Sequence, residues 1–217
     1  MELLLFLPVL LFSIIAHEYA HGWVALKQGD ATAYMLGRLT LNPVPHVDLF
    51  GSVIVPLVLW LSNAGFLFGW AKPVPVNPRN FRDYRRGDIL VSLAGVAVNL
   101  ALAVVFTLLI VAAVWAGRLL PVIEPTLELV RQMAGFGVVI NLVLAVFNLI
   151  PIPPLDGSHV LYHLLPARWG ARYRELGRYG ILVLLAVLFF APGLVSTLLW
   201  PVSLLQSVAE AIIRSWT

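Results

Sequence analysis

Two histidines and a glutamate interrupt an otherwise apolar N-terminal segment. Residues 2–15 are almost wholly apolar, and His17, Glu18 and His21 follow directly. Ionisable groups at membrane depth are costly and usually functional. On a helix, His17 and His21 share one face, with Glu18 about 100° round from His17. The chain must therefore fold so that a membrane helix carries a polar site.

This H-E-x-x-H spacing lets two neutral imidazoles hold one zinc ion while the carboxylate reaches water beside it. The alternative is a structural pair of histidines in a helix bundle. Leaving these groups in hydrocarbon without a partner would cost on the order of several kcal/mol. We therefore favour metal binding, and the working hypothesis is a zinc hydrolase that acts within the bilayer.

Composition supports the membrane setting. The 217 residues are 60% hydrophobic and 12% charged, with a mean hydropathy of +0.92, as in an integral membrane protein. No cysteine is present, so thiolate zinc sites are excluded and His, Asp and Glu remain as ligands. The net charge of +3 is confined mainly to two loops and indicates membrane orientation, not nucleic-acid binding. Residues 1–12 lack a basic start, so we expect the first segment to remain in the mature protein.

The fold class we expect is an all-α polytopic membrane protein in one domain, 1–217. Its helix bundle has about four to six transmembrane segments and a membrane-associated hairpin or re-entrant region. The expected spans are 3–26, 89–116, 133–150 and 179–200. Residues 51–70, which are interrupted at 62–65, are interpreted as a re-entrant hairpin. Residues 202–213 are short for a span and are expected in the membrane interface.

The basic loops at 71–88 and 168–178 indicate the cytoplasmic side. Residues 27–50 are interpreted as a hairpin-like loop against the membrane, in which 32–41 favours short extended pieces. The 32–56 region could then offer a strand edge to an extended substrate. If residues 51–70 re-enter the membrane, His17, His21 and Asp156 all lie toward the cytoplasmic side at similar depth.

A catalytic zinc needs a third protein ligand and one open position. Asp156 is our choice. It follows a proline-broken helix end, whose unwound backbone is tolerated at membrane depth only where it lines a cavity, and Gly157 releases it from helical geometry. The alternative is an ordinary turn aspartate before glycine.

Two other pairs of ionisable residues are candidates for a place in the site. His46 and Asp48 lie in the loop after the first span and could reach the metal or the substrate, or could simply be polar loop residues. His159 and His163 repeat the four-residue spacing without an acid between them. Because four arginines follow, we interpret that pair as a surface helix face.

Three asparagines fall at or near membrane depth. We expect Asn141 to hydrogen-bond between helices. Asn99 and Asn148 could grip a substrate backbone or a developing oxyanion, or could have the same packing role. Gly95, close to Asn99, would let another backbone approach closely.

These residues resemble the site-2 proteases, the intramembrane zinc metalloproteases, and in particular their compact prokaryotic branch without PDZ or CBS domains. The resemblance rests on HEYAH at 17–21, SLAG through Asn99, NLIPIPPLDG at 148–157, and the stretches GRLTLNPVPHVD and GWAKPVPVNP. Val96 departs from the family, whose members often have proline after the glycine, so the local shape around Asn99 is where the resemblance is weakest. The resemblance implies His17, His21 and Asp156 as zinc ligands and Glu18 as the catalytic acid and base.

The expected function is zinc-dependent endopeptidase activity on peptide bonds in or near transmembrane helices of membrane proteins. We expect a multi-pass protein of the cell membrane with its active site toward the cytoplasm and no nucleic-acid partner. The alternative is a zinc-binding membrane protein without peptidase activity, such as a transporter or regulator, in which Glu18 would be a ligand or proton relay. A hydrolase of lipid or prenyl substrates is a third possibility.

Overall fold

The computed structural model describes residues 2–62 and 71–216. All regular secondary structure in this part of the chain is helical, which confirms the all-α prediction. The elements are α1 (Glu2–Gln28), α2 (Thr32–Met35), η1 (Val44–His46), η2 (Leu49–Ile54), α3 (Val55–Leu61), η3 (Pro78–Asn80), α4 (Tyr84–Leu119), η4 (Pro121–Ile123), α5 (Glu124–Leu149), α6 (Asp156–Leu164), α7 (Ala167–Leu176), η5 (Gly177–Tyr179), α8 (Gly180–Phe190), α9 (Pro192–Leu198) and α10 (Trp200–Trp216).

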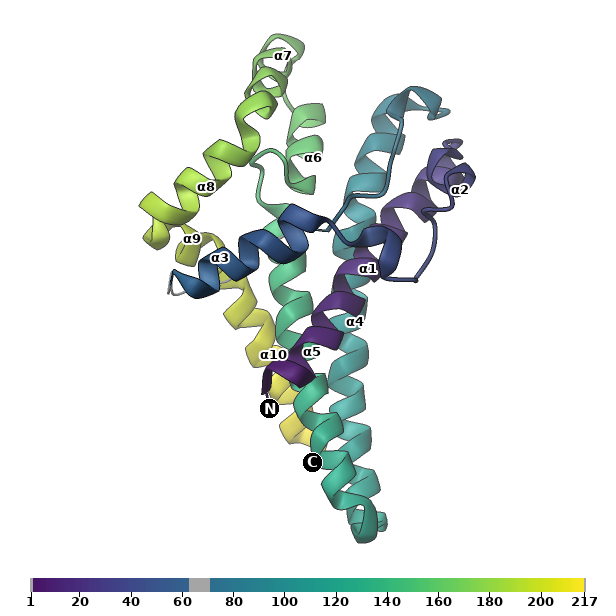
Figure 1. Cartoon of the computed structure of the whole chain (residues 1–217), viewed down its shortest axis with the longest axis vertical. Helices are drawn as coiled ribbons and strands as arrows, with labels where there is room; N and C mark the ends of the chain where they lie inside the picture. The colour runs from purple at the N-terminus through teal and green to yellow at the C-terminus, as the bar shows by residue number, and fades with distance from the viewer. Residues whose placement is uncertain (1, 63–70, 217) are drawn as a thin grey trace.

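The helices α1, α4 and α5 form the centre of the molecule, as Figure 1 shows. Small side chains lie where these helices meet, and Ala20, Ala94, Ala134 and Ala145 are all buried. Small residues let helix backbones approach closely, which is how helices associate where hydrocarbon surrounds them. The bundle therefore holds α1, with its two histidines, directly against α4.

Three described helical segments are long and apolar enough to cross a membrane: Leu4–Gln28, Tyr84–Leu119 and Pro121–Leu149. A fourth follows if Ala167–Phe190 and Pro192–Leu198 count as one span, although the two parts are bent by 102°. The span expected at 179–200 is therefore broken by a bend, and its crossing of the membrane stays a prediction. Pro192 has no N–H to continue the helix, and the chain turns there.

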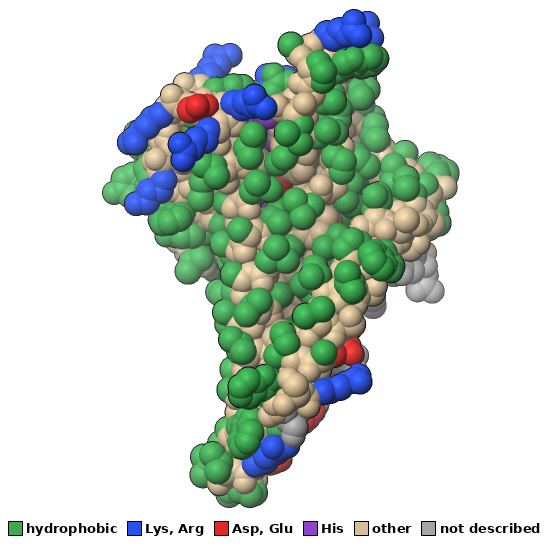
Figure 2. All heavy atoms as spheres, turned by 180° about the vertical axis from the view of Figure 1, so that it is seen from behind, with side chains coloured by type: hydrophobic (Ala, Val, Ile, Leu, Met, Phe, Trp, Pro, Cys, Tyr) green, Lys and Arg blue, Asp and Glu red, His purple; other side chains and the backbone are tan. Residues whose placement is uncertain are grey.

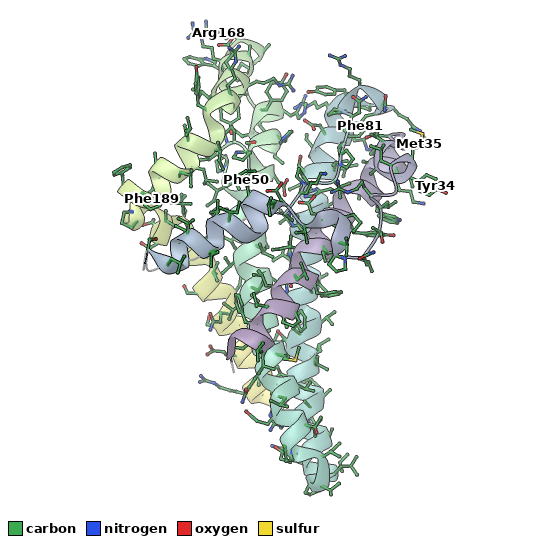
Figure 3. All side chains as sticks on the ribbon, in the orientation of Figure 1. Tyr34, Met35, Phe50, Phe81, Arg168 and Phe189 are labelled. Carbon is green, nitrogen blue, oxygen red and sulfur yellow. The ribbon has the colours of Figure 1, made fainter. Side chains whose placement is uncertain are left out.

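The helix α4 is apolar in its middle and carries charged residues near both ends. α4 has 36 residues, which at about 1.5 Å per residue greatly exceeds the roughly 30 Å hydrocarbon core. Figure 2 shows hydrophobic side chains along the bundle between Lys and Arg side chains at both ends. Arg168 of α7 marks one of these ends in Figure 3.

The segment after α1 differs from the expected extended pieces. Thr32–Met35 is a helix, no strand occurs in residues 2–62 or 71–216, and Tyr34 and Met35 project away from the bundle (Figure 3). The carboxylate of Asp30 accepts hydrogen bonds from the Thr32 amide at 3.1 Å and the Thr32 hydroxyl at 2.5 Å. Such local bonds favour a helical turn over a strand. The strand edge expected at 32–56 is therefore also wrong.

Next, η2 runs into α3, which lies across the bundle in Figure 1. Residues 63–70, the second half of the proposed re-entrant hairpin, lie outside the described residues. The re-entrant path of 51–70 therefore stays a prediction.

The C-terminal helix packs against the bundle, and its expected place in the membrane interface stays a prediction. Val202, Leu205 and Ala209 of α10 pack on a buried cluster from α4 and α5. The indole N–H of Trp115 also donates to the carbonyl of Trp216 at 2.8 Å. Residues 202–213 thus belong to the helix Trp200–Trp216, which covers the side of α4 and α5.

Candidate metal centre

α1 places His17 and His21 one turn apart on the face that meets α4. The two imidazoles meet edge to face, with ring centroids 4.5 Å apart and Nε2 atoms 2.9 Å apart. Both side chains are buried. The helix face predicted from their spacing is therefore present.

Asp156 reaches this pair from the first residue of α6. Its Oδ2 lies 3.2 Å from Nε2 of His17 and 3.4 Å from Nε2 of His21. The chain folds back tightly after α5, and a Cβ at Gly157 would lie 2.2 Å from the carbonyl oxygen of Leu149. Only glycine fits there, and the turn that it permits carries the carboxylate to the imidazoles.

A row of buried amides fixes the protonation of His17. Nδ2 of Asn141 lies 2.8 Å from the Gly137 carbonyl oxygen. A carbonyl oxygen can only accept, so the amide nitrogen of Asn141 faces it and donates. Oδ1 of Asn141 therefore accepts from Nδ2 of Asn99 at 2.7 Å, and Oδ1 of Asn99 faces Nδ1 of His17 at 2.5 Å. Because that oxygen accepts, Nδ1 of His17 carries the hydrogen.

His21 is fixed in the same way, because its Nδ1 lies 2.7 Å from the Val91 carbonyl. In the neutral imidazoles both Nε2 atoms then carry a lone pair and no hydrogen. They converge on Oδ2 of Asp156, which is buried and accepts no hydrogen bond from the described part of the chain. Donor atoms of the three residues lie within 4.8 Å of one another. The lone pairs of these ligand atoms repel one another unless a cation lies between them.

Two imidazole nitrogens and one carboxylate oxygen match the ligand set of a catalytic zinc site with an open fourth position. Second-shell acceptors on the far nitrogen of each imidazole are the usual accompaniment of such ligands. The residues present therefore fit a zinc ion.

Gly95 of α4 makes room for His17. A Cβ on Gly95 would lie 2.4 Å from Cε1 of that imidazole. We expected a neighbouring backbone to use this small residue, but a side chain uses it instead. Any larger residue at 95 would displace the histidine.

Glu18 lies on the wall of the same cavity as the candidate ligands. Its Oε2 accepts a hydrogen bond from the amide of Val74 at 2.7 Å. The cavity has a volume of about 700 Å³, and both histidines, Glu18 and Asp156 line it. The carboxylate of Glu18 thus lies in the same cavity as the imidazoles, and its role as a base stays a prediction.

The remaining predicted residues separate into those at the cavity and those away from it. Asn148 lines the cavity, and its substrate role stays a prediction. Asn99 is fully buried with both ends of its amide engaged, which favours the packing alternative. As expected, Asn141 hydrogen-bonds between helices.

His46 does not join the candidate ligands. It is buried, and its Nε2 lies 3.0 Å from the Thr40 carbonyl. Its own carbonyl accepts from the Lys72 amide at 2.8 Å. Asp48 accepts from the amide of Gly51 at 2.6 Å. Both His46 and Asp48 thus bond within their own loop region, as the alternative of polar loop residues predicted.

The surface interpretation of His159 and His163 is wrong for His163, whose side chain is only 5% exposed. Its Nε2 lies 2.7 Å from Oδ2 of Asp88, a buried carboxylate on α4. One signal was available: Asp88 is an ionisable residue at the start of an apolar span and needs a partner. Its position in the sequence did not show which residue that partner was.

The sequence is similar to a protein family and to several curated proteins. A sequence model described as "Peptidase family M50" matches residues 120–191. "Putative zinc metalloprotease YwhC" from Bacillus subtilis (strain 168) is 41% identical over 206 residues, covering 94% of this chain and 87% of the relative. "Putative zinc metalloprotease Rip2" from Mycobacterium tuberculosis (strain ATCC 25618 / H37Rv) is 36% identical, covering 85% of this chain and 66% of the relative. No solved structure matches the chain.

Proposed function

This chain belongs to peptidase family M50, the site-2 protease family, and from that premise we propose that it is a zinc-dependent endopeptidase of membrane proteins. It would hydrolyse peptide bonds in or near transmembrane helices. The observation that carries the proposal is the convergence of one possible ligand atom each from His17, His21 and Asp156 in the cavity that Glu18 also lines. We propose that residues 1–217 form a single protease domain.

His17, His21 and Asp156 would hold the metal, which when bound supplies Lewis-acid polarisation and an acidified water. Glu18 takes the proton of the attacking water as the oxygen bonds to the peptide carbon. The C–N bond then breaks, and Glu18 returns that proton to the leaving amine. Asn99 and the Val91 carbonyl keep both imidazoles in the tautomer that this chemistry needs.

A helical substrate hides its peptide groups in internal hydrogen bonds, so it must unwind before it is cut. The cavity wall offers a surface for an unwound segment, because residues 71–77 have no helical structure and Ala71, Pro73, Val74 and Val76 line the cavity. Two prolines in this segment cannot donate backbone hydrogen bonds. We propose that the unwound substrate lies along this wall.

We further propose that the protein resides in the cell membrane with the site toward the cytoplasm. Asp88 and His159 line the cavity, and they lie at the end of the bundle that carries Lys72, the arginines of 79–86 and those of α7. Basic residues of membrane proteins gather on the cytoplasmic side. A membrane-impermeant label would report the orientation from a cysteine introduced at Arg168, exposed on α7, or at Val122, exposed in η4 after the far end of α4.

The test is cleavage of a membrane-spanning peptide by purified protein in vesicles. Wild-type protein should cleave and should stop when zinc is chelated, whereas E18Q should keep zinc and lose cleavage. Glu18→Gln keeps the side-chain shape and removes the base. Cleavage that is indifferent to both chelation and E18Q would contradict the proposal, as would zinc flux in vesicles that E18Q alters without any cleavage.

A further inference from the structure

Beside the candidate metal centre lies a second set of ionisable side chains that the chemistry above leaves unused. Asp88 of α4 is 4% exposed and faces two histidines of α6. Nε2 of His163 lies 2.7 Å from its Oδ2. Nδ1 of His159 lies 3.3 Å from Oδ1 and 3.4 Å from Oδ2. One buried carboxylate thus holds two imidazoles.

The two imidazoles have different surroundings. His163 is enclosed, and its ring meets the rings of Tyr84 and Tyr162 at centroid distances of 5.3 and 4.8 Å. The side chain of His159 is 50% exposed and lines the cavity that contains Glu18 and Asp156. His163 therefore holds α6 against α4, whereas the imidazole of His159 lies at the wall of the cavity that contains the candidate metal centre.

The position of His159 on α6 places it within reach of a peptide held at the metal centre. It follows Asp156 by three residues, so both lie on one helix face and are separated by about 4.5 Å along the axis. Because Nδ1 faces Asp88, Nε2 is the ring nitrogen left for a peptide, and it donates a hydrogen bond when the ring is the imidazolium. No residue of the described chain forms a hydrogen bond with that atom. The hydrogen bond with Asp88 raises the pKa of His159, against the opposing effect of burial, and so favours the form with a hydrogen on Nε2.

We propose that His159 is the oxyanion donor of this site, its Nε2–H donating a hydrogen bond to the carbonyl oxygen of the scissile peptide. The role rests on the proposed function. As the water oxygen bonds to the carbonyl carbon, the π electrons of the C=O bond move to oxygen, and Glu18 takes the proton of the water. His159 stabilises the resulting negative charge and keeps its own proton. Donors directed at a developing oxyanion are among the largest contributions to acyl-transfer catalysis.

A matched pair of variants separates this role from anchoring. In His159→Asn, the amide nitrogen takes the place of Nδ1, so the bond to Asp88 is kept and the Nε2 donor is lost. In His163→Gln, the amide nitrogen takes the place of Nε2, so the anchor to the same carboxylate is kept. Both proteins are loaded with zinc, reconstituted with a membrane-spanning peptide, and compared with wild type in kcat, KM, zinc content and thermal unfolding.

We expect H159N to lower kcat about 100- to 1000-fold with little change in KM, zinc content or Tm. Its affinity for a phosphinic peptide, which imitates the tetrahedral oxyanion, should fall in proportion to kcat/KM. H163Q should retain kcat within about threefold. Equal kcat for H159N and wild type, or unchanged phosphinic affinity, would overturn this inference alone. Absence of any cleavage by wild type would overturn the proposed function, and the inference with it.

Discussion

Nδ1 of His17 lies 2.5 Å from Oδ1 of Asn99, a residue 82 positions further along the chain. The contact joins α1 to α4 and leaves Nε2 of the imidazole free for a metal. Asn99→Leu removes the acceptor while keeping similar volume. We expect zinc affinity to fall about 10- to 100-fold, the usual effect of losing a second-shell partner.

Competition with a zinc-binding dye measures this change. The matched control is Thr107→Val, because Thr107 is also buried on α4 but its hydroxyl donates to a carbonyl of its own helix, that of Ala103, at 2.8 Å. T107V should leave zinc affinity unaltered. If N99L and T107V bind zinc alike, the amide row does not position His17.

Gly95→Ala tests the close approach of α4 to the same imidazole. The added methyl group would lie 2.4 Å from Cε1 of His17, so the ring or the helix must move. We expect loss of bound zinc and of cleavage together. Gly135→Ala is the control, since beyond its own stretch of helix no described residue lies within 4 Å of the added Cβ, and alanine should raise helix stability there by about 0.5–1 kcal/mol. Normal zinc content in G95A would contradict the described packing.

Asp30 should make stability depend on pH in the acid range. Burial raises the pKa of its carboxyl, but hydrogen bonds from Thr32, Asn77 and Asn80 outweigh burial and hold the pKa below its ordinary value. Because the folded pKa lies below the unfolded one, the contribution is present above the unfolded pKa, about 4, and is lost as pH falls through the folded pKa.

Asp30→Asn should therefore lower the free energy of unfolding at neutral pH by about 1–3 kcal/mol, because a buried hydrogen-bond network loses the carboxylate charge and one of its two acceptor oxygens. The difference from wild type should shrink as the pH falls below about 4. Thermal unfolding in detergent across this range is the measurement. A difference that stays constant with pH would show that the carboxylate charge is not involved.

Much of the bundle and of the site could be predicted because each follows from local pattern. Long apolar runs gave the helices that became α1, α4 and α5. The spacing of His17 and His21 gave their shared face, and the demand for a third ligand, together with Gly157 after a broken helix, gave Asp156. Each of these signals can be recognised within one short stretch of the sequence.

What could not be predicted depends on distant contacts or competing local bonds. Thr32 has strand propensity, but the Asp30 side chain binds its amide and favours a turn. The pairing of Asp88 with His163 joins residues 75 positions apart. The bend at Pro192 could have been noted from the proline alone, yet its direction depends on packing. The residues around Asn99 in the sequence do not indicate whether its side chain binds other buried side chains or a substrate.

The central claim is that His17 and His21 of α1 and Asp156 of α6 form one zinc site. Zinc content and affinity of purified wild-type protein and of Asp156→Ala test it most directly. We predict one zinc per wild-type chain, two imidazole ligands in its X-ray absorption spectrum, and a loss of affinity in D156A greater than the roughly 100-fold limit for second-shell changes. Stoichiometric zinc in folded D156A with unchanged affinity would contradict it.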